Sequence, residues 1–127
     1  MTASAVRLST VALAELLGTG RFDLTREANT QAEIELFLAE RLPQGCRVER
    51  EVRLSHADRI DFIVGEDVGI EVKLGNARPG DVLRQLERYA AHPRLEALIL
   101  LTNRALALPA VIGGKPVFNV SLGRAWL

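Results

Sequence analysis

The sequence predicts an α/β domain in which helices flank a mixed β-sheet. Three observations favour this class: a helical pattern ahead of three strand-like runs, an amphipathic helix after them, and a continuous apolar run at 98–101 beyond that helix. With 127 residues and 48% hydrophobic content, the chain is expected to form one domain over residues 1–127. It contains no repeat, low-complexity run or long linker that would divide it.

Capping residues and apolar spacing predict two helices in the first third of the chain. Thr10 can cap a short leading helix over about 10–17, which is followed by glycines. Thr30 and Glu33 have the spacing of a capping box, so a second helix is expected over about 31–42. Its apolar positions recur at helical spacing, at Ile34, Leu38 and Leu42.

Strand and helix patterns then alternate. Three runs predict strands at about 48–54, 60–64 and 68–74. Pro79 lies near the start of an amphipathic segment, which predicts a helix over about 81–91. The runs at 98–101 and 115–122 predict two further strands. Because a helix separates the third strand from the fourth, these two strands should be parallel neighbours in a mixed sheet.

Acidic residues occur within the most hydrophobic part of the chain. A three-residue loop between the second and third strands would pair Val64 with Val68 and, further along, Asp61 with Glu71. Opposed residues project on the same face, so the two carboxylates should face each other with Lys73 beside them. The other face is expected to carry Ile60, Phe62, Ile70, Val72 and Leu74. Opposed, buried carboxylates are destabilising alone, so a bound divalent cation such as Mg²⁺ is expected.

Asp61 is followed, after nine residues, by the tripeptide Glu71-Val72-Lys73. This pattern resembles the signature of the PD-(D/E)XK nuclease superfamily, which has the restriction-endonuclease-like fold. Ile60 stands where the signature has proline. The resemblance implies a metal-dependent nuclease, an endonuclease or exonuclease, that hydrolyses phosphodiester bonds in DNA.

The resemblance extends beyond the signature. The order of helix, three strands, helix and strand over about 31–101 is similar to the common core of the superfamily. Gln85 and Tyr89 lie four residues apart on the helix after the third strand, which resembles a pattern of several nuclease branches. The restriction-endonuclease-like version of the mixed sheet is therefore the expected fold.

The resemblance also implies a role for each matching residue. Asp61 and Glu71 would ligate Mg²⁺ or Mn²⁺, and the Val72 carbonyl would add a further oxygen ligand. Lys73 would position or activate the attacking water, and Gln85 would steady that water or the lysine.

An acidic residue of the first core helix is expected near this site, and three residues compete for the role. Taking 100° per residue from Ile34, Glu35 lies at the edge of the buried face, whereas Glu33 points away and already fits the capping box. Glu27 reaches the right angle only if the helix begins earlier than its predicted cap. We predict Glu35.

The charge balance limits the choice of partners. Sixteen basic residues balance sixteen acidic ones, so the chain has no general attraction for nucleic acid or an anionic membrane. DNA would have to be held by local arginines, with candidates at Arg59, Arg78, Arg84 and Arg88. No separate recognition domain is evident, so structure- or end-directed cleavage is expected, and a homodimer is expected by analogy. The alternative is a catalytically silent domain that serves as a binding or assembly module, for example in a phage or mobile element.

Cysteine usage and hydropathy predict the compartment. Cys46 is the only cysteine and cannot form an internal disulfide, which is typical of a reducing environment. The apolar stretch 11–17 is far shorter than the roughly 20 residues that span a bilayer. We expect a cytoplasmic protein without a membrane partner.

Overall fold

The computed structural model describes residues 8–122, which form an α/β domain with three helices and six strands. The helices are α1 (Thr10–Gly18), α2 (Glu27–Arg41) and α3 (Pro79–Ala90). The strands are β1 (Val48–Arg53), β2 (Arg59–Val64), β3 (Val68–Lys73), β4 (Ala97–Thr102), β5 (Val111–Ile112) and β6 (Lys115–Ser121). Within this part of the chain no helix has the length and apolar character needed to cross a membrane.

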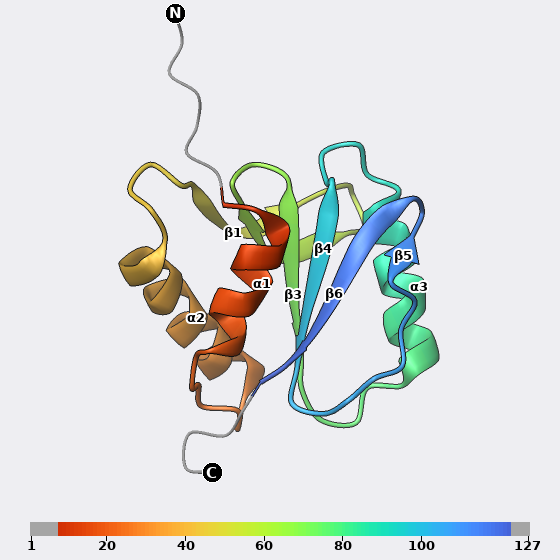
Figure 1. Ribbon diagram of the computed structural model, residues 1–127. Coiled ribbons are helices and arrows are strands. Elements are labelled where there is room, and N and C mark those ends of the chain that lie inside the picture. The colour runs from red at the N-terminus through yellow and green to blue at the C-terminus, as the bar shows by residue number, and fades with distance from the viewer. Residues whose placement is uncertain (1–7, 123–127) are drawn as a thin grey trace, which may run out of the picture.

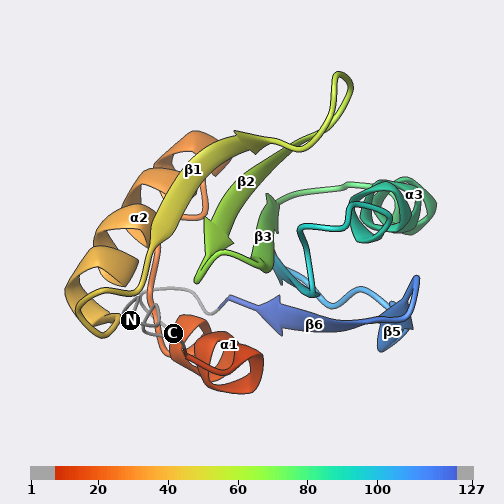
Figure 2. The same ribbon diagram turned by 90° about the horizontal axis from the view of Figure 1, so that it is seen from above.

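The strands form one mixed, open sheet in the order β1-β2-β3-β4-β6-β5. The first three strands are antiparallel, and β4 is parallel to both β3 and β6. The predicted parallel pairing of the third and fourth strands is thus confirmed. Figure 1 shows α1 and α2 on one side of the sheet, and Figure 2 shows the sheet curving around α3 on the other side. Helices therefore cover both faces of the central strands.

The sheet separates two apolar clusters. The cluster between the sheet and α1 and α2 includes Leu17, Ile34, Leu38, Phe62, Ile70 and Val72. The cluster between the sheet and α3 includes Ile60, Ile63, Leu86, Tyr89, Leu98 and Leu100. Every residue of β4 is buried because both of its faces are covered. Full burial of each large apolar side chain contributes about 1.5–3 kcal/mol, so both layers hold the central strands in place.

Helix α1 has nearly the predicted extent but a different cap. Ser9 precedes the helix, and its Oγ accepts a hydrogen bond from the Ala12 N–H at 3.1 Å. Thr10, the predicted cap, is instead the first helical residue. The choice between adjacent hydroxyl residues depends on backbone geometry, because the cap must be extended and Ser9 has a ψ of 152°.

Helix α2 begins earlier than the capping box predicted. Thr30 is fully buried inside the helix, where its hydroxyl is 2.5 Å from the Asp23 carbonyl and 3.1 Å from that of Arg26. Glu33 does accept a hydrogen bond from an upstream backbone N–H, but that donor is Asp23 at 2.8 Å. These polar groups therefore hold the loop before α2 rather than its first turn, and the helix extends back to Glu27.

Candidate functional site

The β2–β3 hairpin has the predicted register near its loop, but its backbone ladder ends before the two acidic residues. The paired residues are Val64 with Val68, Ile63 with Gly69 and Phe62 with Ile70. Beyond them, side chains replace carbonyls as acceptors: Glu71 Oε1 accepts from the Asp61 N–H at 3.1 Å, and Asp61 Oδ2 accepts from the Val72 N–H at 2.8 Å. The two carboxylates therefore meet between β2 and β3, each bound to the backbone of the other strand.

Glu71 is the centre of a polar group on the α3 side of the sheet. Glu71 is only 5% exposed. Gln85 Nε2 donates to Glu71 Oε2 at 3.2 Å, and Lys73 Nζ forms an ion pair with the same oxygen at 3.7 Å. The structure thus brings together Asp61, Glu71, Lys73 and Gln85, four of the five side chains that the sequence nominated for catalysis.

Tyr89 fixes this group against the sheet. Its hydroxyl lies 2.9 Å from the Arg59 carbonyl, accepts from Gln85 Nε2 at 2.8 Å and lies 3.3 Å from Glu71 Oε2. A phenol has one proton, and the shorter distance favours its donation to Arg59. One buried hydroxyl therefore ties α3 to the start of β2, two residues before Asp61.

Ile60 lies on the face opposite to the predicted one. It packs in the α3-side cluster, whereas Phe62 packs under α2, so the strict alternation of a strand is broken at Asp61. The position of Ile60 also explains why residue 69 is glycine, because a Cβ there would lie 2.5 Å from Ile60 Cδ1. The prediction for Ile60 was wrong because it assumed an unbroken pleat through Asp61.

The acidic residue that α2 contributes is Glu27, and the prediction of Glu35 was wrong. Glu27 Oε2 accepts a hydrogen bond from the Leu74 N–H at 3.0 Å, next to the end of β3. Glu35 instead pairs with Arg50 at 3.0 Å. The physical reason is the early start of α2, which places Glu27 two turns before Ile34 on the same side of the helix. The signal in the sequence was this spacing, which the apparent cap at Thr30 concealed.

Burial and neighbouring negative charge disfavour the ionisation of Asp61 and Glu71. Burial, and then the negative charge of Asp61, raise the pKa of Glu71 to about 8, against the opposing effect of Lys73. Burial also raises the pKa of Asp61, and the charge of Glu27 adds to this rise while the Val72 N–H and Lys73 oppose it. The ionised site therefore holds more negative charge than the single nearby lysine offsets.

The oxygen donors of this site fit a hard divalent cation. Within residues 8–122 no three His, Cys, Asp or Glu side chains are grouped so that they alone could hold a metal. Mg²⁺ needs only one or two protein carboxylates, because it keeps several waters. Asp61 Oδ2 accepts from the Val72 N–H, and the Asp61 carboxylate also contacts that of Glu71. The Val72 carbonyl points to the β2 side, like its N–H, beyond the last β2–β3 backbone pair.

The four arginines proposed to bind DNA differ in their availability. Arg84 pairs with Asp81, and Arg88 pairs with Asp58, so the positive charges of both arginines are partly neutralised. Arg59 and Arg78 are exposed and form no side-chain hydrogen bond or ion pair with any residue between 8 and 122. Arg59 and Arg78 are therefore the better phosphate-binding candidates.

Asp58 anchors the turn between β1 and β2 on α3. Its buried carboxylate accepts from Arg88 Nε at 3.1 Å and lies 3.3 Å from His92 Nε2. Burial opposes ionisation, but the hydrogen bonds from Arg88 and His92 lower the pKa of Asp58. This contact holds the hairpin that leads into Asp61.

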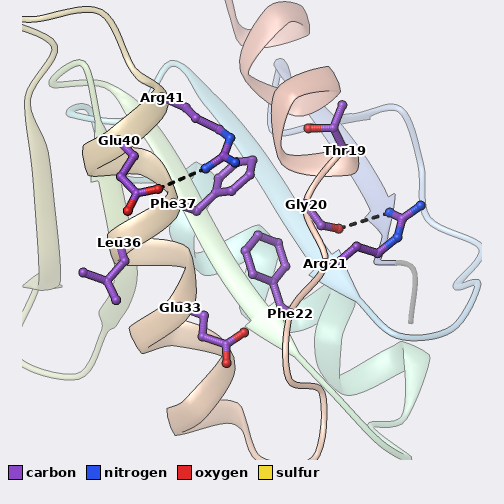
Figure 3. Close-up of a pocket in the computed structure, with 9 residues that line it drawn as sticks. All are labelled: Thr19, Gly20, Arg21, Phe22, Glu33, Leu36, Phe37, Glu40 and Arg41. Carbon is purple, nitrogen blue, oxygen red and sulfur yellow. Dashed lines mark hydrogen bonds and ion pairs between the residues drawn. The ribbon is translucent and has the colours of Figure 1, made fainter. Parts of the chain in front are cut away.

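A hollow of about 460 Å³ lies between α2 and the loop after α1, and it shares no residue with the carboxylate site. Figure 3 shows Phe22 and Phe37 within it, and their rings meet edge to face with centroids 5.2 Å apart. Arg41 lies over Phe37, and Leu36 at the rim is 65% exposed. The two carboxylates that line the hollow are already engaged, since Glu33 accepts from the Asp23 N–H and Glu40 pairs with Arg41. The candidate site therefore stays at Glu71.

The side chains gathered around Glu71 are the basis on which a function can be proposed. Comparison with protein-family models, curated proteins and solved structures found no significant match to this chain.

Proposed function

We propose that the protein is a metal-dependent nuclease with a restriction-endonuclease-like fold, which hydrolyses phosphodiester bonds in DNA. The observation that carries this proposal is the pair of buried carboxylates, Asp61 and Glu71, held together between β2 and β3 with Lys73 beside them. Such a pair is costly without a cation. A cation with open coordination positions is what phosphodiester hydrolysis requires.

Each residue has a proposed role that its contacts support. Asp61, Glu71 and the Val72 carbonyl would hold Mg²⁺ or Mn²⁺, which when bound supplies Lewis acidity and lowers the pKa of water. Lys73 places a positive charge where negative charge develops on the phosphate. The Gln85 amide donates to Glu71 and Tyr89, which leaves its carbonyl oxygen to accept a hydrogen bond from the attacking water and orient it.

We propose that the protein recognises its substrate through contacts to the sugar-phosphate backbone of DNA. The side chains of Arg59 and Arg78 form no ion pair with residues 8–122, so they suit phosphate groups. Phosphate contacts carry no sequence information. Cleavage directed by DNA structure or by DNA ends is therefore favoured over a fixed recognition sequence. The homodimer stays a prediction.

The proposal is tested by incubating the purified protein with linear, nicked, single-stranded and branched DNA. Cleavage should require Mg²⁺ or Mn²⁺ and stop with EDTA. Product lengths over time distinguish internal cleavage from digestion at ends. Absence of cleavage on every substrate with either metal would contradict the proposal.

A silent binding or assembly module is the alternative function. It is favoured by the zero net charge and by the ion pairs that occupy Arg84 and Arg88. A silent module predicts DNA or protein binding that does not depend on metal, together with no cleavage. The same incubation, followed by a gel-shift measurement with and without EDTA, separates the two functions.

Lys73→Ala should reduce cleavage by about a hundredfold or more while DNA affinity changes little, because its charge acts chiefly in the transition state. Single-turnover cleavage and gel-shift titration measure the two effects separately. Lys115→Ala is the matched control, since Lys115 is the only other lysine and donates to the His92 carbonyl instead. Equal losses of stability and activity in Lys73→Ala would indicate a structural ion pair.

Glu27→Gln should weaken Mn²⁺ binding, because it removes a negative charge that acts on Asp61 while its amide oxygen can still accept from the Leu74 N–H. A decrease of about three- to tenfold in affinity is expected, measured by calorimetry. Glu35→Gln is the control, because Glu35 pairs with Arg50 instead. If Glu35→Gln has the larger effect, the assignment of Glu27 is wrong.

A further inference from the structure

Glu51 has an unusual backbone conformation directly opposite the site. Its φ is 49°, in the left-handed region that side chains with a Cβ rarely adopt. Its side chain is exposed and makes no hydrogen bond or ion pair with any residue between 8 and 122. The conformation therefore has no explanation in the contacts of its own side chain.

The left-handed residue coincides with a break in the sheet. Across β1 and β2, Arg50 pairs with Phe62 and Val52 pairs with Ile60, but the intervening pair is missing. That missing pair is Glu51 with Asp61, and the register is the same on both sides of it. The backbone is thus distorted at this one position, without the extra residue of a β-bulge.

The same position is where the side chains of β2 change faces. Phe62 packs under α2 and Ile60 packs under α3, although two residues apart on a regular strand share a face. Asp61 lies between them, and its N–H and carboxylate are both bound to β3. Freed from the β1 ladder, Asp61 can turn toward Glu71 and Val72.

We propose that Glu51 is a positioning residue: its left-handed backbone opens the β1–β2 ladder at Asp61 and aims that carboxylate into the gap between β2 and β3. The conformation, rather than the carboxylate of Glu51, performs this role. The inference rests on the proposed function in one respect, namely that the Asp61 carboxylate binds a metal.

Substitutions at Glu51 that differ in their tolerance of positive φ test this inference. Glu51→Gly and Glu51→Asn adopt positive φ readily and should keep the Mn²⁺ affinity of the native protein within about twofold. Glu51→Val is β-branched and resists it, so its Mn²⁺ affinity should fall by about fivefold or more. Calorimetry with Mn²⁺ alone measures this affinity. Arg53→Val, a β-branched substitution at another exposed position of β1, should leave it unchanged.

Hydrogen exchange of the Val72 amide provides a readout that needs no metal. This amide is bound to Asp61 Oδ2, so it should exchange about fivefold faster or more in Glu51→Val but remain protected in Glu51→Gly. If the native protein binds no Mn²⁺, the proposed metal site fails, and Val72 exchange still decides the role of Glu51. If the native protein binds Mn²⁺ and Glu51→Val matches it in both affinity and Val72 protection, the inference is overturned and the proposed function stands.

A less disruptive pair covers the case in which Glu51→Val does not fold. Glu51→Thr is β-branched but polar, so it should bind Mn²⁺ more weakly and protect the Val72 amide less than Glu51→Ser, which lacks the branch. Equal affinity and equal Val72 protection in these two variants would overturn the inference.

Discussion

Asp61→Asn is expected to abolish DNA cleavage and the response of the protein to metal together. Asparagine keeps the shape of the side chain and an oxygen that can accept from the Val72 N–H, but it removes one of the two carboxylates that would bind the ion. Cleavage should fall by about a hundredfold or more, since even the loss of a partner of a metal ligand costs ten- to a hundredfold.

The response to metal is measured by thermal unfolding with EDTA, Mg²⁺ or Mn²⁺. A cation present at about a hundred times its dissociation constant stabilises the native protein by about 2.7 kcal/mol, and Asp61→Asn should lose this gain. Without metal, the variant should unfold at the same or a higher temperature than the native protein, because half of a like-charge pair is gone.

Asp58→Asn is the matched control for Asp61→Asn. Asp58 lies at the base of the same hairpin but is bound to Arg88 and His92, so its substitution should lower stability and leave the metal response intact. A native protein that shows no metal-dependent shift, combined with an Asp61→Asn variant that is simply destabilised, would favour the silent module.

Without metal, the stability of the native protein should fall as pH rises from about 5 to about 8. The pKa of Glu71 is raised from 4.5 to about 8, so the folded protein holds a proton that the unfolded chain has already lost in this range. Unfolding therefore releases a proton, and each pH unit lowers the free energy of unfolding by up to about 1.4 kcal/mol. The raised pKa of Asp61 acts in the same direction.

Mg²⁺ or Mn²⁺ should remove this decline, because the ion binds the ionised carboxylates and replaces the proton. Denaturant unfolding across the pH range, with and without EDTA, measures both effects. Glu71→Gln is the control, since a neutral amide should flatten the profile in EDTA. The lowered pKa of Asp58 affects stability only below about pH 4, so it does not interfere. A flat native profile in EDTA would mean that Glu71 stays ionised and that Lys73 is sufficient to balance it.

The sequence was sufficient for most of the fold because its apolar periodicities are regular. The order of the main elements, the hairpin loop and the parallel pairing of β3 and β4 all follow from strand and helix spacing. It did not reveal β5, which has only two residues and pairs with β6 across Gly113 and Gly114. So short a strand has no periodicity to detect.

The site was predictable where it depends on strand register and helical spacing, and unpredictable where backbone geometry departs from the ideal. Glu71, Lys73 and Gln85 come together because β3 is regular and α3 packs above it. Glu27 was missed because Thr30 suggested a later start for α2. The position of Ile60 was missed because glutamate at position 51 does not predict a left-handed backbone.

The hydrogen bond from the Leu74 N–H to Glu27 links α2 to the end of β3, and it has a consequence for how the site could diversify. Apart from Glu27, every group around Glu71 comes from the contiguous segment 59–89, which runs from β2 through α3. The loop 103–110 borders this segment through the hydrogen bond from Arg104 to the Ala77 carbonyl, but it contributes nothing to the carboxylate cluster. Changes in that loop therefore need not alter the residues that would bind the metal. For the proposed nuclease, this would let the loop and the carboxylate cluster evolve at different rates.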